Sequence, residues 1–303
     1  MGEFVHAPYA GAHKPFSIGL AALDLAHWIE PDGRLARDLA EKDALLCADR
    51  DRVFRAEAGS EAGQAEVLAL LADHLPARFP TLWRRAGDGL EIVSAGRTVP
   101  LAGDGEVPLV RAARLVQEDL VLMRHGPTGW RLAAAVLCFP SSWSLAEKFG
   151  QDLDGIHAAV PGYPERLGRM MARIFDNLKP DLPAWRLNWS IYPDDDLHHP
   201  EPKQRPRAWS GSTADLLAAT FVRVERQTLR HLPATGDILF TIRTHVDPLA
   251  QFAAHPEGAR LAAGLRTQLL GLDPAQLAYK GLTAHRDHLA AALAAVAGAD
   301  DHD

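Results

Sequence analysis

The chain has 303 residues, of which 47% are hydrophobic and 23% charged, a balance typical of a globular protein and too apolar for general disorder. Its formal net charge of −7 and the lack of a dense Lys/Arg block exclude a nucleic-acid scaffold, which would need to neutralise a row of phosphates. The two cysteines, Cys47 and Cys138, lie far apart in the sequence, which excludes a disulfide framework and favours a reducing compartment.

Targeting and membrane signals are also missing from the sequence. The first residues lack a basic stretch followed by an apolar run, and the longest apolar run, 132–139, is too short to span a bilayer. We therefore expect a cytoplasmic protein that binds neither membrane nor nucleic acid.

The first third of the chain predicts an irregular arm followed by helices. Residues 1–33 are rich in Pro and Gly, and helical spacing of apolar residues follows over 34–48 and 60–74. Ser60 is a residue type favoured at helix N-caps. A small hairpin around Gly96 and a short helix over 110–117 complete this part.

The middle of the chain predicts an antiparallel sheet. Strands, a helical excursion and further strands are expected in turn over 120–124, 130–139, 143–178, 185–192, 221–229 and 238–246. Two strands, helices and three strands form the element order of a PAS-type domain, whose sheet holds a flat cofactor against its helices. Residues 193–212 are polar and rich in proline, which favours an exposed loop.

The fold class expected is therefore α+β, with a PAS-like antiparallel sheet and helices on one face. We expect one compact domain over 1–303, with a core at approximately 118–248 and helical extensions over 1–117 and 249–303. Ala/Leu-rich stretches at 259–270 and 284–297 predict helices that pack on the sheet.

His157 is the first candidate for a metal ligand. Ile156 and a run of small apolar residues flank it, and Pro161 ends the helical stretch. A neutral imidazole in such dry surroundings ligates a metal when its second ring nitrogen has a partner. The alternative from spacing alone is a hydrogen-bonded core histidine.

Three strands each carry arginine on one face. In a strand, Glu225 faces away from Arg226, while Arg243 and His245 share a face opposite Phe240. Arginine suits an anionic ligand such as a propionate, because its planar fork donates paired hydrogen bonds. The alternative is a sheet with one solvent-facing side.

At these residues the chain resembles the alpha-subunit-like members of the haem-dependent oxidative N-demethylase family. The resemblance runs from about residue 16 to residue 249. Its most specific parts, in chain order, are Ile156-His157 with Val160-Pro161, RLNWS at 186–190, ERQTL at 225–229 and FTIRT at 240–244. It implies a PAS-like fold that binds haem b and oxidises a small secondary amine, such as dimethylamine, to a primary amine and formaldehyde. Dioxygen is the oxidant, and electrons come from flavin and iron–sulfur clusters on partner subunits.

The resemblance also implies residue roles. His157 becomes the iron ligand, and Arg226 and Arg243 are expected to pair with propionates or to hydrogen-bond dioxygen. Glu225 is expected to pair with the substrate ammonium, because a buried cation needs a counter-charge, and Asn188 is a further pocket residue. Two other functions stay open at this point: a non-enzymatic haem or gas sensor of PAS type, and a cofactor-free module that binds a small ligand.

Overall fold

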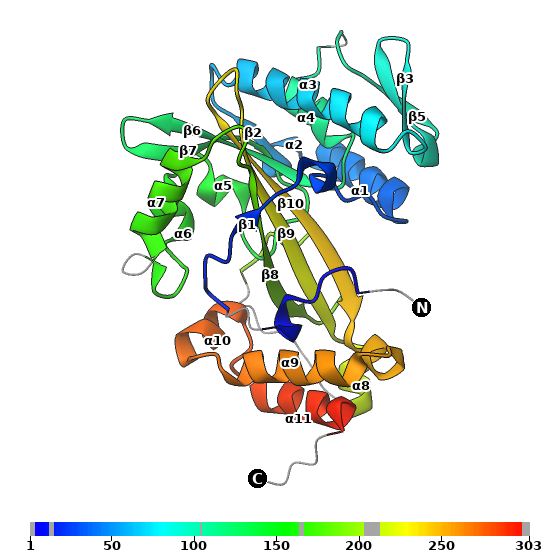
Figure 1. Ribbon diagram of the computed structural model, residues 1–303, viewed down its shortest axis with the longest axis vertical. Helices are drawn as coiled ribbons and strands as arrows, with labels where there is room; N and C mark the ends of the chain where they lie inside the picture. Colours follow the sequence, from blue (N-terminus) through cyan, green and yellow to red (C-terminus); the bar gives the residue numbers. More distant parts are fainter. Residues whose placement is uncertain (1–3, 12–14, 104, 164–166, 203–212, 299–303) are drawn as a thin grey trace.

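A seven-stranded antiparallel sheet forms the centre of the structure, a computed structural model that describes residues 4–11, 15–103, 105–163, 167–202 and 213–298 (Figure 1). Its strands lie in the order β1-β8-β9-β10-β6-β7-β2. Their bounds are β1 Ala21–Ala22, β2 Phe54–Ala56, β6 Asp119–Gly126, β7 Gly129–Val136, β8 Ala184–Tyr192, β9 Phe221–His231 and β10 Ile238–Pro248.

Five of these strands, β6 to β10, form the core that the sequence predicts. Taken by themselves they lie in the spatial order 2-1-5-4-3, with the helical excursion between the second and the third. The β9–β10 hairpin is the longest pairing and runs in unbroken register from Phe221↔Pro248 to His231↔Ile238. Gly236 adopts a φ of 76° in its turn, a conformation that glycine accepts without strain.

Because side chains alternate along each strand, the two faces of the sheet bury different residues. Phe240 and Ile242 pack with the helical excursion, whereas Leu239 packs with the N-terminal helices. We call the face that carries Phe240 the cavity face and the face that carries Leu239 the extension face.

The helices of the excursion lie on the cavity face. They are α5 Leu145–Lys148, α6 Leu153–His157 and α7 Gly168–Asn177. Helix α6 begins at Asp152, whose carboxylate accepts from the Gly155 backbone N–H as an N-cap. The predicted start of α7 at residue 165 lies outside the described residues.

The N- and C-terminal extensions cover the extension face and lie at opposite ends of the long axis (Figure 1). The N-terminal extension holds α1 Leu35–Ala48, α2 Arg50–Val53, α3 Glu61–Arg78, α4 Pro108–Ala113 and a small sheet of β3 Trp83–Ala86, β4 Gly89–Ile92 and β5 Arg97–Pro100. The C-terminal extension holds α9 Gly258–Leu270, α10 Pro274–Lys280 and α11 Arg286–Ala297, and α8 Thr213–Ala218, which precedes β9, packs against α11. Single turns of 3-10 helix lie at η1 Pro8–Ala10, η2 Leu25–His27 and η3 Val93–Ala95, and a longer one at η5 Leu249–Ala254. The α+β prediction, with core helices on one face and additional terminal helices, is confirmed.

Local differences from the predicted elements have clear physical causes. Strand β7 ends at Val136 rather than at residue 139, because the backbone N–H groups of Cys138 and Phe139 donate to the Asp119 carboxylate instead of to a neighbouring strand. Helix α10 was not predicted, although its capping box of Asp273 and Gln276 is readable in the sequence. The second half of the predicted loop over 193–212 lies outside the described residues, because residues 203–212 are not described.

Among the described residues, no helix has the length and apolar content needed to cross a membrane.

Candidate functional site

A cavity of about 460 Å³ lies between the cavity face and helices α5–α7. This volume is within the range of pockets that hold small molecules and cofactors. Its walls are largely apolar, with Val121, Met123, Leu132, Phe240 and Ile242 contributed by the sheet. The helices, the 141–143 segment, the N-terminal arm and α10 supply most of the remaining wall, so a partly open apolar chamber adjoins a few polar side chains.

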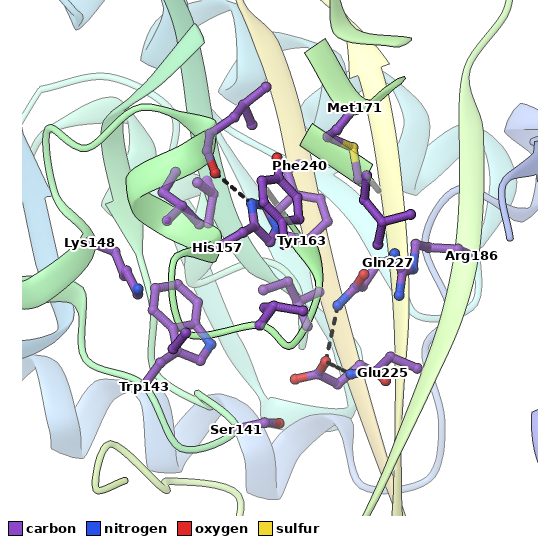
Figure 2. Close-up of a pocket in the computed structure, with 18 of the residues that line it drawn as sticks. Ser141, Trp143, Lys148, His157, Tyr163, Met171, Arg186, Glu225, Gln227 and Phe240 are labelled. Carbon is purple, nitrogen blue, oxygen red and sulfur yellow. Dashed lines mark hydrogen bonds between the residues drawn. The ribbon is translucent and has the colours of Figure 1, made fainter. Parts of the chain in front are cut away.

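His157 lies in the wall of this cavity at the end of α6 (Figure 2). Its Nδ1 atom lies 2.8 Å from the carbonyl oxygen of Leu153, one turn earlier. Only a protonated Nδ1 can donate to that carbonyl, so the neutral ring carries its lone pair on Nε2. A metal-binding histidine characteristically donates its other ring N–H to such an acceptor, which fixes the tautomer and the ring plane.

Two further features hold His157 in this state. Its ring stacks on Tyr163 with centroids 4.5 Å apart and an interplanar angle of 12°. Burial lowers the pKa of His157, and the nearby cations Arg186 and Lys148 lower it further against the opposing effect of the Leu153 hydrogen bond. The imidazole is therefore neutral at physiological pH and has an Nε2 lone pair available to a ligand.

Glu225 is the buried carboxylate of the site. It lies on β9 and is only 7% exposed. The side-chain amides of Asn188 and Gln227 donate to its Oε2 atom over 3.1 and 3.0 Å (Figure 2). Oε1 has no hydrogen-bond partner among the described residues, so one oxygen of the carboxylate stays available to a ligand in the cavity.

Arg186, on β8, is the cation of the cavity wall best suited to bind a ligand. Its Nε atom is buried, and no residue in the described ranges forms a hydrogen bond or ion pair with its guanidinium. Burial lowers the pKa of Arg186, an effect that the more distant Glu225 carboxylate opposes. A half-buried guanidinium whose buried Nε lacks an acceptor favours an anion in the cavity, because an unsatisfied buried donor is costly.

Lys148 and Lys280 also line the cavity, but both ammonium groups already have protein acceptors. Lys148 donates to the Gly155 carbonyl over 3.3 Å, and Lys280 donates to the Trp189 carbonyl over 2.6 Å. Arg186 therefore stands apart from the other two cations of the cavity wall.

The other two predicted arginines lie elsewhere. Arg226 and Arg243 are register partners on the extension face, and neither lines the cavity. Arg226 donates to the carbonyls of His27 and Trp28 and pairs with Glu30.

Arg243 donates to the carbonyls of Glu30 and Thr244 and pairs with Asp32. Acceptors from the N-terminal arm occupy both guanidinium groups, so the predicted propionate or dioxygen role does not fit their positions.

Arg223, at the end of β9 near the cavity, has a clamping role. Its guanidinium donates to the carbonyls of Phe139, Pro140, Asp196 and Leu197 and to the hydroxyl of Ser141. These acceptors come from two separate loops, so a single side chain fastens both loops at one rim of the cavity.

Of the predicted site residues, the structure thus brings His157, Asn188 and Glu225 to one cavity and places Arg226 and Arg243 on the other side of the sheet. Sequence reasoning missed Arg186, Gln227 and Tyr163 as site residues. The signal for the first two was present, since Arg186 shares a face with Asn188, and Gln227 with Glu225, by the two-residue period of a strand.

These groups fit a haem. The cavity offers an apolar chamber, an imidazole with a free Nε2 and a half-buried guanidinium that suits a propionate. The available carboxylate oxygen of Glu225 adds a polar position beside it.

A comparison with protein families matches residues 19–290 to the family described as haem-dependent oxidative N-demethylase, alpha subunit-like. The chain belongs to this family. The predicted resemblance is therefore confirmed, and it covers the whole sheet and most of both extensions. The family's name indicates a haem-dependent oxidoreductase whose alpha subunit works within a multi-subunit system.

Proposed function

We propose that this chain is the haem-binding component of an oxidative N-demethylase that converts a small secondary amine, such as dimethylamine, to a primary amine and formaldehyde. The environment of His157 carries the proposal: a neutral imidazole, with Nδ1 bonded to a backbone carbonyl, lines an apolar cavity in a haem-dependent family. The 2-1-5-4-3 strand order supports a PAS-like assignment for the core.

Each group in the cavity receives a role. His157 Nε2 binds the iron of haem b, and Arg186 replaces Arg226 and Arg243 as the partner of a propionate. The haem supplies the reductive activation of dioxygen. The apolar wall excludes water from the reacting amine.

Glu225 binds the substrate. A small secondary amine is protonated at neutral pH, and the Glu225 carboxylate gives this cation a counter-charge inside an apolar chamber. Asn188 and Gln227 hold the carboxylate in place through Oε2, so Oε1 faces the ammonium. This arrangement positions the N-methyl group without requiring a proton from the protein.

The overall change consumes one dioxygen, two electrons and two protons for each amine, and it releases the primary amine, formaldehyde and water. We propose that a flavin and an iron–sulfur cluster on partner subunits deliver the electrons. The alpha-subunit designation of the family supports this division of labour.

The first test is the absorption spectrum of protein expressed with added haem precursor, for the wild type, His157→Ala and His288→Ala. His288 is exposed on α11 and serves as the control. We expect a Soret band in the wild type and in His288→Ala, and its loss or a shift to a form without axial histidine in His157→Ala. A haem spectrum unchanged by His157→Ala would contradict the ligand assignment.

A turnover assay distinguishes the N-demethylase from a haem sensor and from a cofactor-free binding module. With a chemical reductant and dimethylamine, the haem-loaded wild type should release formaldehyde. Haem binding without formaldehyde from any small secondary amine would favour the sensor, and a protein that takes up no haem would favour the cofactor-free binding module.

A further inference from the structure

A second cluster of potential ligands lies on the extension face, on the far side of the sheet from His157. It consists of His6 from the N-terminal arm, Glu30 from the segment after η2, and His245 from β10. One ligand atom from each residue lies within 4.8 Å of the other two. We call this group the His6–Glu30–His245 cluster.

In both histidines, Nε2 is the ring nitrogen that approaches Oε2 of Glu30. Nε2 of His6 lies 2.7 Å from Glu30 Oε2, and Nε2 of His245 lies 3.4 Å from it. His245 is only 8% exposed, and apart from the long 3.4 Å approach to Glu30, its buried Nε2 has no hydrogen-bond partner in the described part of the chain. A buried ring nitrogen without a hydrogen bond is costly, and a metal ion would satisfy it.

The separations suit a small divalent ion. Zinc bonds of 2.0–2.2 Å in a tetrahedron place ligand atoms about 3.4 Å apart. The His245–Glu30 separation already has this value, and a movement of less than about 1 Å by the half-buried His6 would bring its nitrogen to the same distance.

The surroundings orient the carboxylate and leave room for another ligand. Arg226 Nε pairs with Glu30 Oε1 over 2.9 Å, so the guanidinium fixes one oxygen and leaves Oε2 for the histidines. A cavity of about 260 Å³ adjoins Glu30, Asp32 and His245 and has space for a water molecule or another small ligand. Two histidines, one carboxylate and an open position form a common coordination set for zinc and related divalent ions.

We propose that His6, Glu30 and His245 bind a divalent transition-metal ion of the zinc class. The ion fastens the N-terminal arm to β10, since the arm supplies His6 and Glu30 and the strand supplies His245. The same arm continues to Phe16 and Ser17, which line the haem cavity, so the metal fixes a segment that helps to close that cavity. This site is separate from the haem iron and does not depend on the proposed N-demethylase activity.

The test measures zinc binding to the full-length protein, expressed with added haem precursor as above. The protein is stripped with EDTA, dialysed against Zn²⁺ at known free concentrations, and zinc is counted by elemental analysis separately from haem iron. The variants are His6→Gln, His245→Gln and the control His27→Gln, whose side chain lines the adjoining cavity outside the cluster. Glutamine at position 6 retains an N–H donor for Glu30, so the arm keeps a hydrogen bond to this carboxylate in the absence of metal.

We expect one zinc per chain in the wild type and in His27→Gln, with micromolar or tighter affinity. His6→Gln should weaken binding by about 100-fold or more, because loss of an outer partner of a metal ligand alone costs 10–100-fold. Zinc should also raise the melting temperature of the wild type and leave that of His6→Gln unchanged. Zinc binding that both cluster variants retain, or no binding at millimolar zinc, would overturn the proposal, and either outcome is independent of the Soret band of His157.

Discussion

Arg226 and Arg186 lie on neighbouring strands of one sheet, yet their surroundings are opposite. On the extension face, Arg226 meets two backbone carbonyls and a carboxylate, and its register partner Arg243 is equally well supplied. On the cavity face, Arg186 is half-buried, and its buried Nε has no hydrogen bond to a described residue. The same residue type thus stabilises the fold on one face and favours an external anion on the other, and the difference is made by acceptors from the N-terminal arm.

The largest effect should come from Arg226→Met. The substitution leaves Glu30 Oε1 and two backbone carbonyls without the Arg226 donor, and breaking a buried pair of this kind costs about 3–5 kcal/mol of unfolding free energy. Urea unfolding measures it, with Arg52→Met as the control. The pair of Arg52 with Glu201 is exposed and contributes about 0–1 kcal/mol. A loss of unfolding free energy as small as that of Arg52→Met would show that Arg226 does not stabilise the extension face.

Glu225→Gln tests the carboxylate of the cavity face. We expect kcat/KM for a secondary amine to fall by about 10- to 100-fold, because the ammonium loses its buried counter-charge. The Soret band should stay in place. Glu147→Gln is the matched control, since Glu147 also lines the cavity but is exposed. Equal losses in both variants would show that the amine is attracted by general charge and not bound at Glu225.

Arg186→Met should give the smallest change and the sharpest contrast with Arg226→Met. The stability of the haem-free protein should hold or rise, since the variant removes a half-buried charge whose buried Nε has no acceptor. Haemin affinity should fall by about tenfold, the effect of one charge-assisted hydrogen bond of about 1.4 kcal/mol.

A haemin diester, which lacks both carboxylates, provides the control for Arg186. Wild type and Arg186→Met should bind the diester equally well. A tenfold difference that persists with the diester would mean that Arg186 acts through packing and not through a propionate.

Periodic patterns in the sequence predicted the sheet well. The apolar run of β7, the turn before it and the β9–β10 hairpin all follow from local rules, and the strand period separates Glu225 from Arg226 without any structure. Applying that period more strictly would have kept Arg226 and Glu225 out of one site.

Other features depend on contacts that no local pattern contains. Glu30 and Asp32, which occupy the two arginines, come from an irregular arm about two hundred residues earlier in the chain. The importance of His157 came from a family resemblance, since its spacing alone did not distinguish a ligand from a core histidine. The physical reason to treat His157 as a ligand comes from the structure, in the hydrogen bond to Leu153 and the cavity around the ring.

The Arg223 clamp has a consequence for how molecules enter the cavity. One guanidinium ties the 139–141 loop to the 196–197 loop, so opening at this rim requires Arg223 to release one loop and break its three or two hydrogen bonds together. Elsewhere in the cavity wall, Phe16 of the arm meets Tyr279 of α10 edge-on, and the Lys280 ammonium lies over the Phe16 ring. Thermal fluctuations should therefore open the cavity asymmetrically, and least readily at the rim where Arg223 holds the two loops.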